Sequence, residues 1–173
     1  MVPLELVGVR VEVPANTPMV LLREPEGRQR LLPILIGTAE ATAIHAAVEG
    51  LEPPRPLTHD LMAMLLDEFG VGLARIVITE VRDHTFYAEL HLVEGTDPLD
   101  NLPTDVDADH VVSCRPSDAI ALAVRCGAAI YAAEDLIDEC GQEPEADPAE
   151  EAEEIIDEFR DFIENVSPED FKP

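Results

Sequence analysis

Two short segments of the sequence place the same kinds of polar residue at the start of a predicted helix. Residues 115–118 read Arg-Pro-Ser-Asp, and residues 55–60 read Arg-Pro-Leu-Thr-His-Asp. An arginine beside the free N–H groups of a helix start can bind a phosphate oxygen, and carboxylates bind divalent cations. A histidine can transfer a proton near neutral pH. If the two helix starts face one another, these groups could surround one pocket and hydrolyse a phosphodiester.

Each candidate residue has a defined role in this hypothesis. Arg55 and Arg115 are the candidate phosphate-binding residues. His59, Asp60 and Asp118 are the candidate catalytic residues, and His59 would transfer the proton. Asp60 and Asp118 are also the candidate ligands of a metal ion, either Mg²⁺ or Mn²⁺.

Structural roles are open for the same residue types. Thr58 and Ser117 are predicted to cap their helices, because a hydroxyl oxygen at a helix start accepts a backbone N–H. An aspartate in the first turn can do no more than complement the helix dipole. Arg115 could instead form a buried ion pair that joins two elements. Glu40, in a separate predicted helix, is a further supporting residue.

The patterning of the chain predicts the elements that must position these residues. Alternation and short apolar runs predict strands at residues 4–13, 19–24, 31–37, 73–81, 85–93, 110–114 and 128–132. Helical spacing predicts helices at residues 38–49, 58–69 and 117–126, with a helical turn at 134–139. The first three strands form a β-meander, in which Pro33 favours an edge strand or a strand start. Two further strands form a central hairpin, so we predict an α+β fold with a mixed sheet and packed helices.

Composition limits the classes of protein that this chain can belong to. The 173 residues carry 37 acids against 11 bases, for a formal net charge of −26. No basic patch is visible, although proteins that bind nucleic acid usually have one. The three cysteines suit neither a disulfide framework nor a zinc motif, which indicates the cytoplasm. We expect no membrane contact, since no run approaches the ~20 apolar residues of a membrane span. We also expect no signal peptide, because Glu5 interrupts the apolar run at the start of the chain.

The last part of the chain differs in composition from the rest. Residues 142–173 hold 13 acids and two bases, and we predict an acidic linker followed by an amphipathic helix at about 148–165. Its apolar stripe consists of Ile155, Ile156, Phe159, Phe162, Ile163 and Val166. Residues 1–141 are therefore predicted to form the folded domain. Within this domain, residues 94–109 form a predicted acidic loop.

Several motifs together resemble the bifunctional nuclease domain family. They are LPILIG with Glu40 and Ala41, then RPLTHDL, TFYAEL, RPSDAIALA and VSPEDF, and the resemblance covers about residues 3–140. It implies a strongly bent mixed sheet, self-association, and DNase and RNase activity. The recurrent polar residues of the family fall at Glu40, Arg55, Thr58, His59, Asp60, Arg115, Ser117 and Asp118. This chain departs from the family pattern at Ala129, where proline is common, and in its longer acidic loop.

Two functional hypotheses follow. The first is a nuclease that hydrolyses DNA and RNA with little sequence preference, and it requires a locally positive pocket or a bridging metal ion because the chain is so acidic. The second is a non-catalytic, self-associating interaction or regulatory module with an acidic docking helix. We expect a homodimer or other homo-oligomer in either case. An open cleft between the two helix starts favours the nuclease, whereas ion pairs that lock them together favour the module.

Overall fold

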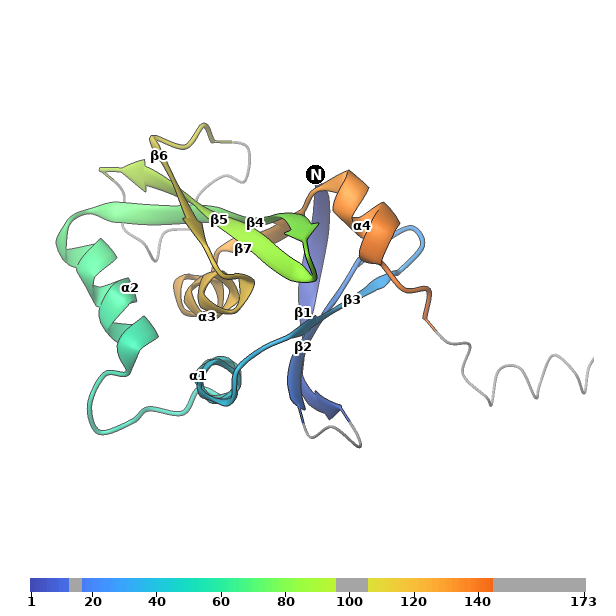
Figure 1. Cartoon of the computed structure of the whole chain (residues 1–173). Helices are drawn as coiled ribbons and strands as arrows, with labels where there is room; N and C mark the ends of the chain where they lie inside the picture. The colour runs from blue at the N-terminus through green and yellow to red at the C-terminus, as the bar shows by residue number, and fades with distance from the viewer. Residues whose placement is uncertain (13–16, 96–105, 145–173) are drawn as a thin grey trace, which may run out of the picture. The chain divides into compact units, whose positions relative to one another are not determined.

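The structure, a computed structural model, describes residues 1–12, 17–95 and 106–144 (Figure 1). A compact unit runs from Met1 to Glu143. The predicted helix at 148–165 and most of the predicted acidic loop lie outside the described residues. The strands are β1 (Val2–Glu12), β2 (Thr17–Arg23), β3 (Leu31–Leu35), β4 (Val71–Arg82), β5 (Thr85–Glu94), β6 (His110–Cys114) and β7 (Ala129–Ala132). The helices are α1 (Thr38–Val48), α2 (Thr58–Glu68), α3 (Pro116–Cys126) and α4 (Glu134–Cys140).

The sheet is mixed, and β1 connects its two parts. The strand order is β3-β2-β1-β7-β4-β5-β6, and among these pairs β4 and β7 are parallel while the others are antiparallel. Residues 2–4 of β1 pair with β7, whereas residues 5–12 pair with β2. A bulge between Leu6 and Gly8 interrupts the second pairing, and a bulge bends its strand. This arrangement confirms the prediction of an α+β fold with a strongly bent mixed sheet.

Local sequence signals account for several of these features. Pro33 lies in β3, which is an edge strand, as proline's missing N–H requires. The β-meander and the β4–β5 hairpin form where the alternation predicted them. The hairpin turn consists of Asp83 and His84, both with positive φ (48° and 60°). Such dihedrals at both central residues are those of the tight turn that suits the twist of a hairpin.

The prediction that Thr58 and Ser117 cap their helices is wrong. The N-cap residues are Leu57 for α2 and Arg115 for α3, and neither of these two residues caps its helix through its own side chain. Pro116 is the first residue of α3, because the fixed φ of proline already suits a helix. In α2 the carboxylate of Asp60 accepts the N–H of Leu57 at 2.7 Å, which is the acidic half of a capping box.

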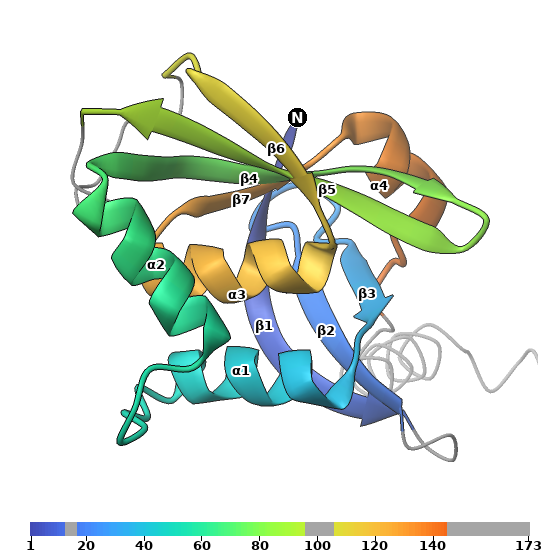
Figure 2. The ribbon, with the colours of Figure 1, turned by 60° about the vertical axis from the view of Figure 1, so that its left-hand side comes forward.

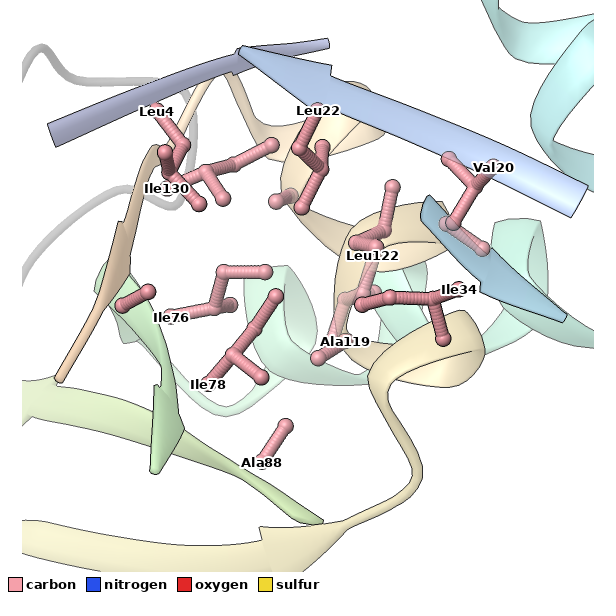
Figure 3. Close-up of a cluster of buried hydrophobic side chains, with 14 of the residues drawn as sticks. Leu4, Val20, Leu22, Ile34, Ile76, Ile78, Ala88, Ala119, Leu122 and Ile130 are labelled. Carbon is pink, nitrogen blue, oxygen red and sulfur yellow. The ribbon is translucent and has the colours of Figure 1, made fainter. Parts of the chain in front are cut away.

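The core surrounds α3. Residues 119–123 of this helix are at most 1% exposed, and α3 contacts α1, α2, β4 and β5. Figure 2 shows α3 between the two parts of the bent sheet, with α1 and α2 along its other sides. Figure 3 shows Leu122 of α3 among buried side chains from β1, β2, β3, β4 and β7. Close packing on every side makes the position of this helix well defined.

Truncation inside this core tests the arrangement. We expect Leu122→Ala to lower the free energy of unfolding by roughly 2–5 kcal/mol, because the side chain is 1% exposed and its loss leaves a cavity. Val48→Ala is the control, since Val48 is 49% exposed and should lose much less. Urea denaturation followed by circular dichroism measures both variants. Equal losses would contradict the placement of Leu122 in the core.

Candidate functional site

Three polar or charged side chains are buried among the described residues: Glu24, His59 and Ser117. Glu24 has a structural partner, because Arg30 donates to its two carboxylate oxygens from Nε and Nη2, each at 2.8 Å. The hydrogen bonds from Arg30 lower the pKa of Glu24. Arg30 also donates to Asp138 of α4 at 2.6 Å, so this network holds the β2–β3 turn against α4. The other two buried residues lie in the first turns of α2 and α3, where the sequence predicts the site.

His59 and Asp118 form a hydrogen-bonded pair between these two helix starts. The distance from His59 Nε2 to Asp118 Oδ1 is 3.1 Å, and His59 is 7% exposed. Burial raises the pKa of Asp118, but hydrogen bonds from Arg115 and His59 outweigh it, and the net pKa is below the usual value. An ionised carboxylate only accepts hydrogen bonds, so Nε2 of His59 carries the proton. Nδ1 is then left with a lone pair when the ring is neutral.

Arg115 is the N-cap residue of α3 and binds two carboxylates. It donates to both oxygens of Asp118, from Nε at 2.7 Å and from Nη2 at 3.0 Å. Nη2 also donates to Oε1 of Glu40, in the first turn of α1, at 2.9 Å. Its Nη1 has no hydrogen-bond partner within the described residues, and the side chain is 65% exposed. Arg115 therefore keeps an N–H donor that an anion can reach.

Gly37 makes room for the carboxylate of Glu40. A Cβ atom at Gly37 would collide with Oε2 of Glu40, whose side chain folds back over this residue. Glu40 was predicted as a supporting residue, and its contact with Arg115 joins the start of α1 to the start of α3. The lack of a side chain at Gly37 is thus part of the way in which Arg115 is positioned.

Asp60 has a different environment from Asp118, although the two segments look alike in sequence. Its Oδ1 accepts Nε of Arg125 at 2.5 Å, and its Oδ2 accepts the N–H of Leu57. The hydrogen bond from Arg125 lowers the pKa of Asp60, against the opposing effect of burial. Arg125 also donates to the backbone carbonyls of Ala121 and of Ala43 in α1. Asp60 therefore helps to join three helices and has no hydrogen bond to His59 or Asp118.

Sequence reasoning missed this role of Arg125. Arg125 lies in the last turn of α3, where a positive charge favours any helix, and the local pattern indicates no further role. The available signal was an arginine at the far end of a helix that is otherwise apolar after Asp118. A charge in such a helix is buried only when it is paired. Its partner could not be named, because the segment 55–60 lies more than 60 residues earlier in the chain.

Arg55 lies apart from the other candidate residues. It is exposed in the connection between α1 and α2, two residues before the N-cap Leu57, and has no hydrogen bond or ion pair within the described residues. It does not line the cavity beside Arg115. The structure therefore brings His59, Arg115, Asp118 and Glu40 together and places Arg55 and Asp60 outside this cluster.

A cavity of about 650 Å³ lies beside the cluster, and we refer to it as the His59 cavity. Its lining residues are Ala39, Glu40, Thr42, Ala43, Leu57, Thr58, His59, Met62, Cys114, Arg115 and Asp118. Known ligand sites have volumes of roughly 300–1,000 Å³ and combine apolar walls with a few convergent polar groups. The His59 cavity has both properties, with Glu40, Arg115 and Asp118 as its charged groups.

The candidate metal ligands do not fit a shared metal ion. Asp118 accepts hydrogen bonds from Arg115 and His59, while both oxygens of Asp60 bind Arg125 and Leu57. Within residues 1–12, 17–95 and 106–144, no group of three or more His, Cys, Asp or Glu residues is arranged to hold a metal. Each carboxylate thus already has cationic or N–H partners where a metal would need its oxygens.

Comparison with known proteins places this geometry in a family. The model of the bifunctional nuclease domain matches residues 20–145, which include all the candidate residues. The chain belongs to the bifunctional nuclease domain family. An uncharacterized protein of Mycobacterium tuberculosis strain H37Rv is 41% identical over 172 residues, covering 96% of each chain.

Plant members of the bifunctional nuclease domain family match a shorter part. Bifunctional nuclease 2 of Oryza sativa subsp. japonica is 28% identical over 69% of this chain and 34% of its own length. Bifunctional nuclease 2 of Arabidopsis thaliana is 28% identical over 62% of this chain and 30% of its own length. The chain therefore spans about a third of these plant proteins.

In the described part of the chain, no helix has the length and apolar character needed to cross a membrane.

The ion pairs of Asp118 predict a pH-dependent stability. The pKa of Asp118 is lowered in the folded state, so its pairs stabilise the fold above the unfolded pKa and are lost as pH falls through the folded pKa. We expect Asp118→Asn to cost about 1 kcal/mol at pH 7, since solvent screens the exposed Arg115. The cost should begin to shrink as the pH falls below the usual aspartate pKa of 3.8 and disappear below the lowered pKa of the folded state.

Denaturant unfolding at pH 7 and pH 3 measures this difference. Asp83→Asn is the matched control, because Asp83 has no ion pair in the described residues and asparagine tolerates its positive φ. A cost of Asp118→Asn that is the same at both pH values would contradict the electrostatic explanation.

Proposed function

We propose that this protein hydrolyses phosphodiester bonds of DNA and RNA, with little sequence preference, at the His59 cavity. The observation that carries the proposal is the contact of a buried His59 with Asp118 and of Asp118 with a largely exposed Arg115. All three residues line one cavity in a chain of the bifunctional nuclease domain family. The plant relatives named as bifunctional nucleases support a nucleic acid as substrate.

Each residue has a chemical role in the proposed reaction. Asp118 orients the ring of His59 by accepting its Nε2–H, and Nδ1 accepts a proton from the attacking water as the new P–O bond forms. The P–O bond to the leaving oxygen then breaks, and this oxygen takes a proton from solvent water. Nη1 of Arg115 donates to a non-bridging oxygen of the phosphate, where negative charge increases in the transition state. Glu40 holds Nη2 of Arg115 and so orients the guanidinium group. This division of work resembles other sites in which a carboxylate positions a histidine base.

The strong acidity of the chain affects how substrate binds. A net charge of −26 repels a polyanion at long range. Arg115 is itself paired with two carboxylates, so its field is largely neutralised. Binding therefore depends on hydrogen bonds at short range, from the free Nη1 donor, or on a metal ion that screens the charges. For this second reason we also propose that Mg²⁺ or Mn²⁺ takes part in substrate binding.

Cleavage assays with purified protein test the proposal. We expect cleavage of single-stranded DNA and RNA oligonucleotides, and we expect His59→Gln and Asp118→Asn to lower kcat about 100-fold or more, as loss of a general base does. Arg115→Gln should also raise KM, because it removes a phosphate contact. Arg10→Gln is the control, since Arg10 is exposed on β1 and lines neither the His59 cavity nor its surroundings. Circular dichroism verifies that each variant is folded.

Equal cleavage by the wild type and the folded variants would indicate a contaminant and reject the site. Two further variants separate the remaining predictions. Arg55→Gln should lower activity if the exposed arginine binds phosphate elsewhere on the substrate, whereas Asp60→Asn should mainly lower stability through Arg125. Activity that is lost in EDTA and restored by Mn²⁺ would support the metal, and full activity in EDTA would contradict it.

A second candidate function, self-association, rests on the exposed face of α2. Apart from the buried His59, this helix and its two cap residues present large apolar side chains to solvent: Leu57, Leu61, Met62, Met64, Leu65 and Phe69, which are 36–75% exposed. Contiguous apolar patches of this kind mark interaction sites. We propose that a second copy of this chain covers this face, as the expected homodimer requires. The acidic C-terminal helix of the alternative hypothesis lies outside the described residues.

Size-exclusion chromatography with light scattering tests self-association. We expect a dimer for the wild type and a monomer for Leu65→Glu with Phe69→Glu, because buried charges would destabilise the interface. Val48→Glu is the control, since Val48 is similarly exposed but belongs to α1. A monomeric wild type, or a dimer that survives the double substitution, would contradict an α2 interface.

A further inference from the structure

A second cavity shares Arg115 with the His59 cavity, and we refer to it as the hairpin cavity. Its volume is about 820 Å³, and it is bounded by the β4–β5 turn, the end of β3, the start of α3 and the end of α4. These segments gather on one side of the compact unit in Figure 2. Arg115 lines both cavities, so a ligand bound at its guanidinium group can extend into either of them.

The floor of the hairpin cavity is apolar. Ile36, Val81 and Phe86 contribute to it, and all three are buried or half-buried against the core. Its rim is polar, with His84 and Arg115 as donors and Asp83 and Glu139 as acceptors. An inorganic anion would use only the polar rim and leave the apolar floor without a contact. A ligand that contacts both the apolar floor and the polar rim needs an anionic group for Arg115, joined to a flat ring with donors and acceptors of its own.

The hairpin turn carries a side chain that the turn itself does not need. Two-residue turns with positive φ at both positions usually contain Asn-Gly, because glycine has no steric cost there. This chain has Asp83 and His84 instead, so an imidazole occupies a strained position on the rim of the cavity. Strained residues of this kind often serve a binding or catalytic role.

We propose that the hairpin cavity binds a nucleobase of the substrate, next to the phosphate held by Arg115. The base lies on the apolar floor beside Phe86, and His84 donates to or accepts from the edge of the base. The proposal rests on the proposed function, because it places the phosphate at Arg115. It adds the substrate unit that the site recognises, which is a nucleotide with an unpaired base.

NMR titrations of the full chain with adenosine 5′-monophosphate and with inorganic phosphate test this inference. We expect the nucleotide to bind roughly tenfold more tightly than phosphate, as stacking of one base predicts. Its binding should shift the amide signals of Ile36, Val81 and Phe86. His84→Gly should weaken nucleotide binding about fivefold, the factor for one hydrogen bond, without lowering the melting temperature.

Gln29→Gly is the matched control. Gln29 also has a positive φ (53°) in a turn, but it lines neither cavity, so this substitution should leave nucleotide affinity unchanged. Equal affinities for nucleotide and phosphate, or equal effects of the two glycine substitutions, would overturn the inference. Cleavage without base binding here would reject this inference alone, whereas base binding without cleavage would reject the proposed function alone.

Discussion

Enclosure of α3 requires that its charged side chains lie only at its two ends. The residues between Asp118 and Arg125 are apolar, and several are completely buried. At one end Asp118 is paired with Arg115, and at the other Arg125 is paired with Asp60. A buried charge without a partner would cost far more than the packing could return. The pair of Arg125 with Asp60 therefore makes it possible to bury the C-terminal end of α3 against α1 and α2, whereas the exposed Arg115 leaves the other end in contact with solvent.

This constraint also divides the work between two similar helix starts. Asp60 faces the C-terminal end of α3 and joins α1, α2 and α3 through Arg125. Asp118 faces the buried His59, so the imidazole lies beside a cavity and not in the apolar core. One aspartate thus stabilises the helix packing, and the other belongs to the candidate site. The same residue type in the same local pattern acquires different chemistry from its neighbours.

The chain matches its relatives mainly over the folded unit. The bifunctional nuclease domain matches residues 20–145 and the relative from Mycobacterium tuberculosis covers 96% of the chain, whereas the plant nucleases are matched over about a third of their length. The geometry adds a buried histidine, a carboxylate and an accessible arginine donor around one cavity. These groups are the ones that the proposed acid–base chemistry uses, and the exposed apolar face of α2 is the separate surface proposed for self-association.

The sequence by itself determined the elements and the identity of the helix starts. Alternation predicted the strands and the β4–β5 hairpin, and Pro33 marked an edge strand, because these depend on neighbours close in the chain. The predicted caps were wrong, since Leu57 and Arg115 are the N-cap residues and each helix begins one residue after its N-cap. Only the tertiary structure paired Asp60 with Arg125 and left Arg55 exposed. Asp60 and Arg125 are 65 residues apart and meet only when the fold brings α2 against α3. No local pattern encodes whether Asp60 will pair with Arg115 or with Arg125.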